Sequence, residues 1–339
     1  MHAGKNYSFK EVIIWTRRDI YKLFLIATAS VICYKFLGWN WLAVPWLPIA
    51  LLGTAVAFVV GFKNNASYDR LWEARRIWGS IVNTSRSFGI MVKDFIPTQQ
   101  STQKSKAELQ EIRAIIMKRH FAWLTAMRFS LREKRTWEAI YKRDNAEYRD
   151  AWFSVPEQKG SLHDELARYL SEEELQWVLT KSNKAAQLIS LQSAHLKSLH
   201  EQGLIESFRH IELERCLAEL YNQQGASERI KNFPYPRQYA TANLYFIKLF
   251  TFLVPLGLLQ EFDRLGEYFI WLVIPFSTLS TWVFTTMEKI GESSESPFEG
   301  SANDVPITAI SRTIEIDLRE MHEMSDIPPP LKPENNILV

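Results

Sequence analysis

Hydrophobic residues are gathered into four windows that are nearly free of charge, and charged residues fill the stretches between them. Two windows, Trp41 to Phe62 and Tyr268 to Met287, contain no charged residue at all. A helix of about 20 residues is about 30 Å long, which matches the hydrocarbon thickness of a bilayer. Both windows therefore predict helices that cross a membrane.

The other two windows contain lysines. The window from about Ile20 to Leu37 carries Lys22 and Lys35 near its ends, where long side chains reach the membrane surface. The window from about Ala240 to Gln260 contains Lys248, which in a membrane must face protein or water. For both windows, the alternative is a buried helix of a soluble protein.

The distribution of basic residues predicts the orientation. They precede the first window and follow the second, at Lys5, Lys10, Arg17, Arg18, Lys63, Arg70, Arg75 and Arg76. Residues 261–267, between the third and fourth windows, hold three acidic residues and one arginine. The positive-inside rule then places both termini and the long middle region in the cytoplasm. We expect a multi-pass protein of the cell inner membrane or plasma membrane.

The regions outside the windows predict an all-α protein. Apolar residues recur at helical spacing in 108–119, 162–200 and 205–222, no strand alternation persists, and the polar stretch 98–106 indicates a loop. Residues 327–339 contain four prolines and predict a mobile tail. We expect five parts: 1–62 with the first two transmembrane helices, a helical cytoplasmic region 63–238, transmembrane helices three and four in 239–290, a cytoplasmic segment 291–326, and the tail 327–339.

Beyond Phe62, the second window runs on without a proline or glycine until Gly79. A helix that continues from the membrane into the cytosol would couple the two regions rigidly. Its cytoplasmic part requires cover from other helices at its apolar positions, which are Leu71, Trp72, Ile77, Trp78, Ile81 and Val82.

Composition adds little to this pattern. The chain is 47% hydrophobic and 23% charged, values that a soluble protein also shows. Its 12 Trp and 20 Phe fit either an aromatic-rich soluble core or the aromatic belts of a membrane protein, where several flank the windows. The net charge of +2 gives no reason to expect a nucleic-acid partner.

The sequence contains no motif that predicts an enzyme. It has no phosphate-binding loop, dinucleotide fingerprint or zinc-protease motif. His195 and His200 are five positions apart, so they fall on different parts of a helical face and do not indicate a metal site. The acidic residues that begin at Glu172 follow Ser171 and indicate a helix cap.

Two motifs resemble a known family. Residues 61–86, GFKNNASYDRLWEARRIWGSIVNTSR, resemble the second-helix segment of bacterial bestrophin homologues, and residues 296–321, SPFEGSANDVPITAISRTIEIDLREM, resemble the segment after their last span. The resemblance implies an all-helical homopentamer in the lipid bilayer, with one axial pore and four transmembrane helices per subunit. It also implies a hydrophobic neck lined by the second span, a cytoplasmic vestibule and a second constriction. Animal bestrophins are calcium-activated chloride channels, so the expected function is passive passage of inorganic anions.

The resemblance places Thr54, Phe58 and Phe62 around the neck. A spacing of four keeps these residues on one helical stripe, although ordinary helix packing produces the same spacing. Phenylalanine edges are electropositive and suit anions, and an apolar ring can close a pore by dewetting. Thr54 departs from the usual bulky apolar residue and predicts a wetter outer ring.

Two further positions follow from the resemblance. Pro48 lies where a helix could begin, and free N–H groups there could hold an anion, or the proline is simply a good first helical residue. The cytoplasmic constriction is expected at Ile205 first and Phe208 second.

We expect no cofactor. The animal calcium sensor uses a dense acidic cluster, but the matching stretch here offers Glu299 and Asp304 with neutral Ser301 and Asn303. Calcium prefers six to eight oxygens with several carboxylates. Asp304 is the only candidate ligand, and its alternative role is to cap the following helix.

Two other functions remain open. A hydrophobic neck does not choose the sign of an ion, so a cation-permeable or non-selective channel is one alternative. A membrane-anchored scaffold or sensor without conductance is the other, because the large cytoplasmic part could recruit a protein partner.

Overall fold

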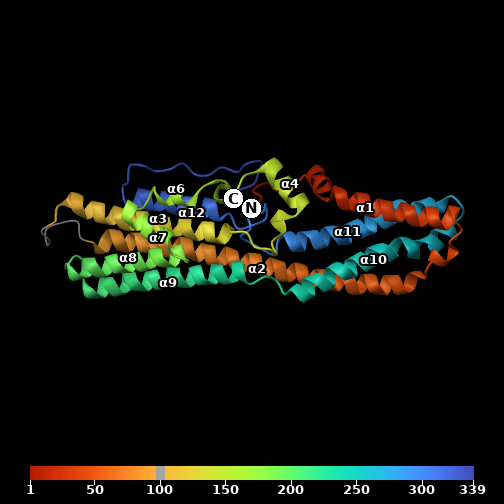
Figure 1. Ribbon diagram of the computed structural model, residues 1–339, viewed down its shortest axis with the longest axis horizontal. Helices are drawn as coiled ribbons and strands as arrows, with labels where there is room; N and C mark the ends of the chain where they lie inside the picture. Colours follow the sequence, from red (N-terminus) through yellow and green to blue (C-terminus); the bar gives the residue numbers. More distant parts are fainter. Residues whose placement is uncertain (97–103) are drawn as a thin grey trace.

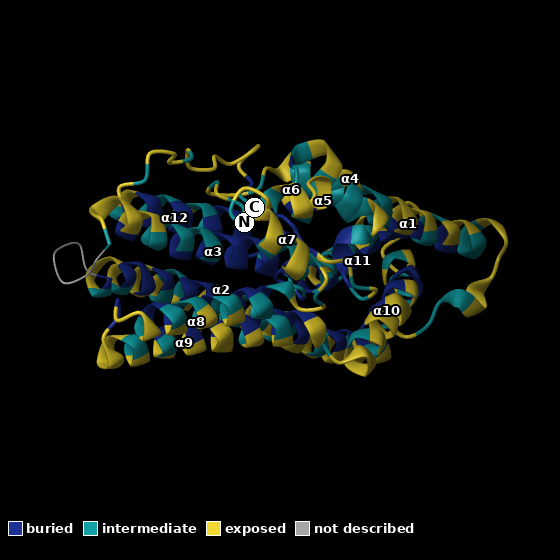
Figure 2. Cartoon of the chain, turned by 60° about the vertical axis from the view of Figure 1, so that its left-hand side comes forward, coloured by how far each residue is buried: buried dark blue, intermediate teal, exposed yellow. Residues whose placement is uncertain are grey.

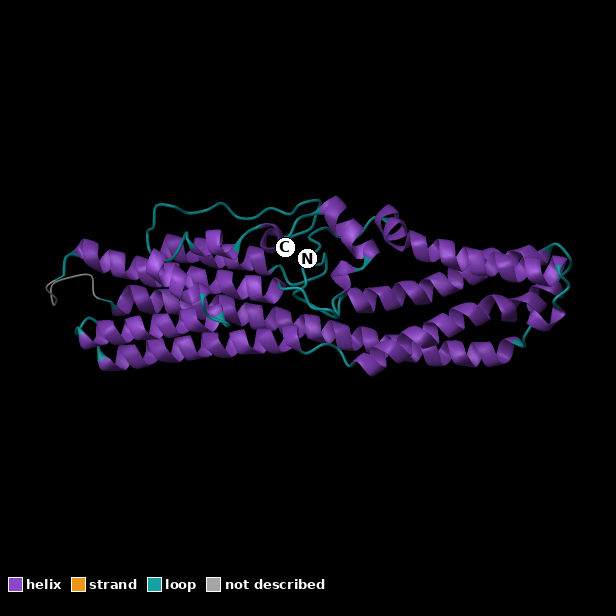
Figure 3. Ribbon diagram, viewed as in Figure 1, coloured by secondary structure: helices purple, strands orange, loops and turns teal. Residues whose placement is uncertain are grey.

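A computed structural model describes residues 1–96 and 104–339, and these ranges contain helices and loops but no strand (Figure 3). The predicted all-α fold is confirmed for this part of the chain. The loop expected at 98–106 lies largely outside the described residues.

The α-helices are α1 Phe9–Phe36, α2 Trp46–Phe95, α3 Lys106–Arg132, α4 Arg143–Trp152, α5 Pro156–Lys159, α6 Leu162–Leu166, α7 Glu172–Leu179, α8 Lys184–Glu201, α9 Ser207–Asn232, α10 Arg237–Asp263, α11 Val273–Ser293 and α12 Ile307–Met321. Short 3₁₀ turns are η1 Asn40–Leu42, η2 Ala139–Tyr141 and η3 Phe269–Leu272.

The longest element is α2, a single helix of 50 residues. It is about 75 Å long at 1.5 Å per residue. Its first half packs against α10 and α11, and its second half packs against α9, α12 and α3 (Figure 1). The predicted continuity through Gly79 is confirmed, and one rigid rod joins the two halves of the molecule.

The second half of α2 forms one wall of the largest hydrophobic core (Figure 2). Trp78 and Ile81 are fully buried there, and Leu71 is partly buried against the same cluster. Trp72 is the exception among the apolar positions expected to need cover, because 53% of it remains exposed. The amphipathic pattern of the sequence therefore gives the buried face correctly except at this tryptophan.

Within residues 1–96 and 104–339, three stretches are long and apolar enough to cross a membrane, namely Asn40–Phe95, Arg237–Asp263 and Phe269–Ser293. They correspond to the second, third and fourth predicted windows, so Lys248 does not disqualify the third. The first predicted window is not among them. Helix α1 begins at Phe9, and its apolar part is confined between Lys22 and Lys35. It nevertheless packs along α11 and α10 in the same half of the molecule (Figure 1).

The C-terminal segment does not behave as the predicted mobile tail. Ile337 is 1% exposed, the Leu338 N–H donates to the Met1 carbonyl over 2.8 Å, and the Ala309 N–H donates to the Val339 carbonyl over 2.9 Å. The prolines rule out a helix, but they leave the last residues free to pair with the N-terminus and the start of α12. Both ends of the chain therefore lie side by side (Figure 1).

Candidate pore-lining face

One face of α2 is exposed along its whole length. Phe58 is 65% exposed, Phe62 is 70% exposed, and Thr54 is exposed as well. The same stripe begins at Leu47 and Leu51, which are 72% and 67% exposed. The helical repeat places all five side chains on a single side, away from the rest of the chain. They are available to lipid or to other subunits.

The opposite face of α2 packs tightly on α10. A Cβ atom added at Gly53 would lie 2.8 Å from the Phe250 ring, and one added at Gly257 would lie 2.5 Å from Ile49. Backbones approach this closely in a membrane only where small residues permit it. This contact fixes the rotation of α2, and therefore the direction in which Phe58 points.

A buried ion pair fixes the same helix immediately after Phe62. Lys63 is 2% exposed, and its Nζ lies 2.5 Å from Oε1 of Glu288. Glu288 is 7% exposed, and its second oxygen accepts a hydrogen bond from the Asn243 side chain. These residues lie on α2, α11 and α10, so one polar cluster joins three helices.

Sequence reasoning missed this cluster, because Lys63 was counted among the basic residues that set the orientation. Arg70 is also not a free surface charge, since its guanidinium donates to the backbone carbonyls of Glu295 and Ile230 over 3.0 Å each. A usable signal was present, however. Glu288 directly follows a charge-free window, and an acid at that depth requires a basic partner.

Thr54 uses its hydroxyl locally. The Oγ1 group donates to the Ala50 carbonyl over 3.1 Å, one turn back along α2. The hydroxyl proton is therefore occupied, and only the oxygen lone pairs and the methyl group are offered to the exposed face. A ring of Thr54 side chains would present acceptors rather than donors to a passing ion.

Helix α2 begins two residues before Pro48. Pro45 is the N-cap and Trp46 is the first helical residue, so Pro48 is the third residue and not the first. It still lies in the first turn, where backbone N–H groups have no intrahelical acceptor. The expected anion site would therefore use the N–H groups of Trp46, Leu47 and Ile49.

The two candidates for the cytoplasmic constriction are placed very differently. Ile205 is 1% exposed and belongs to the largest hydrophobic core, which also contains Trp78 and Ile81 of α2. Phe208, the second residue of α9, is 76% exposed. A side chain buried inside its own subunit cannot narrow a shared axis. Of the two candidates, Phe208 is the one whose side chain is exposed, and the position of the constriction stays a prediction.

Asp304 is engaged within the protein. Its carboxylate accepts hydrogen bonds from the Gly300 N–H over 2.7 Å and from the Ser301 hydroxyl over 2.5 Å, and the Arg132 guanidinium lies 3.3 Å away. Asp304 does not cap α12, whose N-cap is Pro306 without a side-chain hydrogen bond. The alternative capping role is therefore wrong.

The neighbouring Glu299 is also buried. It is 1% exposed, and Oε2 accepts a hydrogen bond from the Ala139 N–H over 2.9 Å. Burial, with further contributions from Asp304 and Glu138, raises the pKa of Glu299 well above its usual range. Asp304 already has a cationic partner in Arg132, and calcium prefers several ionised carboxylates, so the absence of a calcium site stays a prediction.

These features define a class of protein. Among the described residues, three membrane-length helices and one continuous helix that joins the two halves of the molecule are features of a helical membrane protein. Residues 12–320 match the family described as Bacterial/Fungal Bestrophin protein. The chain belongs to the bacterial bestrophin family, and the resemblance inferred from the two motifs is confirmed.

Relatives of known name agree with this placement. The voltage-dependent anion channel-forming protein YneE of Escherichia coli K12 is 28% identical over 289 residues, which are 85% of this chain and 81% of YneE. The Ralstonia nicotianae protein RSc3414, with the same descriptive name, is 25% identical over 88% of this chain and 86% of its own length. A solved bacterial bestrophin homologue from Klebsiella pneumoniae shares the fold, with a TM-score of 0.74, 22% identity, and coverage of 91% of this chain and 98% of that chain.

Proposed function

We propose that five copies of this chain assemble around one axis and that anions pass through the resulting pore down their gradient. The observation that carries this proposal is the exposed apolar face of α2, with Phe58 and Phe62 directed away from the rest of the subunit. Helix α2 has its remaining sides fixed by α10 and α11, so this face is the one available for a shared axis. Thr54, Phe58 and Phe62 would form the neck, and Phe208 would form the cytoplasmic constriction.

The membrane topology completes this proposal. Because α1 runs beside α10 and α11, we propose that it crosses the bilayer with them and gives four spans per subunit. The two chain ends pair with each other and lie beside the cytoplasmic helices. Both termini are then cytoplasmic, as the basic flanks indicate.

Selectivity requires charge, because apolar rings do not distinguish anions from cations. Below the neck, the exposed face of α2 continues through Asn65, Asp69 and Arg76. A ring of Asp69 side chains would favour cations, and a ring of Arg76 side chains would favour anions. The names of the curated relatives support anions as the physiological choice for this chain.

The test is a flux assay on purified protein in liposomes that carry a chloride-sensitive dye. Phe58→Ala and Phe62→Ala widen and hydrate the neck, so chloride flux should rise severalfold. Phe252→Ala, on the exposed side of α10, removes a ring of similar exposure, 55%, and should leave flux unchanged.

Two results would overturn the proposal. Wild-type protein that is monomeric in detergent and nanodiscs, and silent in liposomes, would exclude a shared pore. If the reversal potential does not shift with a chloride gradient when the cation is impermeant, the pore does not conduct chloride and cation permeation is the better interpretation. The scaffold alternative predicts a co-purifying protein and no conductance.

A further inference from the structure

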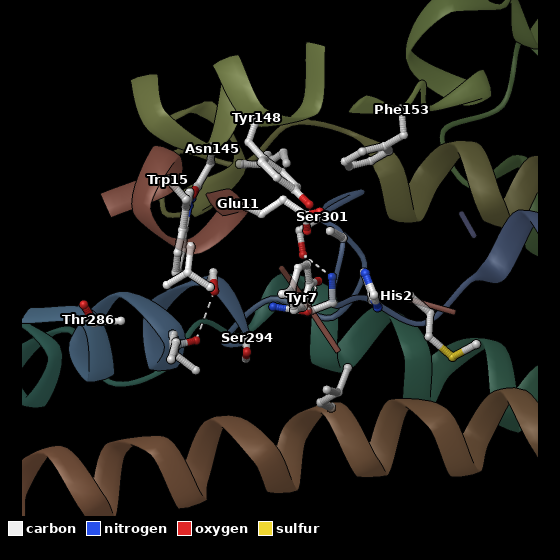
Figure 4. Close-up of a pocket in the computed structure, with 18 residues that line it drawn as sticks. His2, Tyr7, Glu11, Trp15, Asn145, Tyr148, Phe153, Thr286, Ser294 and Ser301 are labelled. Carbon is white, nitrogen blue, oxygen red and sulfur yellow. Dashed lines mark hydrogen bonds between the residues drawn. The ribbon is translucent and has the colours of Figure 1, made fainter. Parts of the chain in front are cut away.

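A cavity of about 510 Å³ lies where the membrane half of the subunit meets its cytoplasmic half (Figure 4). Pockets of this size hold small organic molecules. Leu71 of α2, Ile140 of η2 and Ile290 of α11 contribute aliphatic surface to it. The cavity is separate from the exposed face of α2 on which the pore proposal rests, since Leu71 lies on another side of that helix.

Aromatic rings form much of the remaining wall. Tyr7 precedes α1, Trp15 belongs to α1, Tyr148 belongs to α4, and Phe153 follows α4. In Figure 4, Trp15 stands on one side of the cavity and Phe153 on the other, with Tyr7 and Tyr148 between them. Four rings from two segments of the chain, 7–15 and 148–153, therefore surround one space.

These rings are held in place before any ligand binds. The Trp15 indole donates to the Asn145 side chain over 2.7 Å, and the Tyr7 hydroxyl donates to the Asn303 side chain over 2.8 Å. The Tyr148 and Phe153 rings meet edge to face, with centroids 6.5 Å apart. A preorganised wall of this kind loses little conformational freedom when a ligand enters.

Glu11 is the one carboxylate among the described residues that line the cavity. Salt bridges at this junction use other acids, since Arg18 binds Asp144 and Lys289 binds Asp144 over 2.7 Å. Across residues 1–96 and 104–339, no basic side chain lies within ion-pair distance of Glu11. The cavity thus combines aromatic faces with one carboxylate that lacks a cationic partner.

Met1 and His2 also line the cavity, but among the described residues neither the N-terminal amine nor the His2 ring forms an ion pair with Glu11. Burial, with a smaller contribution from the Glu11 carboxylate, raises the pKa of Tyr148 to about 12. The pKa of Tyr7 is also raised, first by burial. Both phenols are therefore neutral at physiological pH. The His2 ring lies against Tyr7 at a tilt of 37°, with centroids 4.1 Å apart, and the Met1 amine donates to the Leu338 carbonyl.

We propose that this cavity binds a small organic ammonium ion with apolar substituents. The ammonium group would lie against Glu11 and the faces of Tyr7 and Tyr148, because aromatic faces and a carboxylate attract the same cation. The apolar substituents would contact Leu71 and Ile290. A fully apolar ligand would leave the Glu11 carboxylate without a partner, and an anion would be repelled by it.

The test uses the purified full-length chain in detergent and isothermal titration calorimetry. Benzyltrimethylammonium and choline are the cationic probes, and 3,3-dimethylbutan-1-ol is the neutral isostere of choline. We expect saturable binding of the cations, with benzyltrimethylammonium binding more tightly, and binding of the neutral isostere at least tenfold weaker than that of choline.

Matched variants separate the parts of the site. Glu11→Gln should lower the affinity for benzyltrimethylammonium at least tenfold. Glu173→Gln, which changes an exposed acid on α7, should leave that affinity unchanged. Tyr148→Leu should weaken binding and Tyr148→Phe should retain it, because the ring and not the hydroxyl contacts the cation. Circular dichroism and thermal melting confirm that each variant is folded.

The source of the ammonium group is distinguished in nanodiscs. If a lipid headgroup occupies the cavity, benzyltrimethylammonium will bind more weakly to protein in phosphatidylcholine nanodiscs than in phosphatidylglycerol nanodiscs. Equal affinities in the two kinds of nanodisc will indicate a free ligand. Equal binding of choline and its neutral isostere would overturn the proposal, as would full affinity in Glu11→Gln. These experiments measure binding and not ion flux, so a negative result would leave the pore proposal unaffected.

Discussion

Removal of the lysine in the buried cluster below the neck is the sharpest perturbation that the structure offers. Lys63→Met keeps the length and much of the volume of the side chain but deletes the charge. The partner carboxylate of Glu288 then remains 7% exposed, with Asn243 as its other hydrogen-bond partner. A buried charge that has lost its partner is strongly destabilising, whereas the intact pair contributes little net free energy.

The expected magnitude follows from burial. Deleting one member of a buried ion pair costs about 3–5 kcal/mol. A loss of 1 kcal/mol lowers Tm by about 2–4 °C in chains of about 150–250 residues, so we expect a fall on the order of 10 °C here. The double variant Lys63→Met/Glu288→Leu removes both charges and should recover most of that loss.

The assay is thermal unfolding of detergent-purified protein, followed by tryptophan fluorescence and compared at one scan rate. Lys22→Met is the control, because the Lys22 side chain is 74% exposed and its Nζ lies 3.9 Å from Asp19. Such a surface pair is worth about 0–1 kcal/mol, so Tm should hardly move. The reasoning is refuted if Lys63→Met melts like the control, or if the double variant is less stable than the single one. Lys63→Met should also change chloride flux, since it releases the helix rotation that orients Phe62.

Three further predictions concern packing and pH. Gly53→Ala should cost about 1–3 kcal/mol through overpacking against Phe250, whereas Gly61→Ala, whose added Cβ meets nothing within 4 Å, should be neutral or slightly stabilising. The pKa of Glu299 in the folded protein is raised above its ordinary value of 4.5, so its contribution to stability is complete below pH 4.5 and is lost as the pH rises through the folded-state pKa. Tm should therefore fall over this pH range in the wild-type protein, and Glu299→Gln should reduce that fall. Burial lowers the pKa of His120 to about 3, so stability should fall by about 1.4 kcal/mol per pH unit as the pH drops below 6.5, and His120→Gln should remove that dependence.

Each of these predictions has a contrary outcome. Equal melting of the two glycine variants would mean that α2 and α10 do not approach each other as closely as the structure shows. A Glu299→Gln variant with the same pH profile as wild type would place an ionised carboxylate at that position. If the stability of His120→Gln falls below pH 6.5 as steeply as that of the wild-type protein, carboxylates alone govern unfolding in acid.

The sequence predicted the elements of this protein well. Windows with no charge predicted α2 and α11, and a window with one lysine predicted α10, because unpaired charge is costly to bury in lipid and is therefore rare in such segments. The continuity of α2 was also readable, since nothing between Phe62 and Gly79 stops a helix. The two motifs were sufficient to indicate the family.

Other features depended on which chain segments meet in space. Lys63 and Glu288 are 225 positions apart, and no local pattern says that they face each other. Ile205 and Phe208 lie three positions apart in similar surroundings, yet one enters the core and the other stays outside, because a turn separates the first from α9. The cavity around Glu11 needs residues from both ends and the middle of the chain.

Sequence alone therefore determined the helices, the membrane windows and the family, because each depends on the energy of a short stretch in water or lipid. Tertiary structure decided which face of α2 is free, which buried charges have partners, and where the C-terminal residues dock. Those outcomes depend on contacts between distant segments, whose energies appear only when the helices pack together.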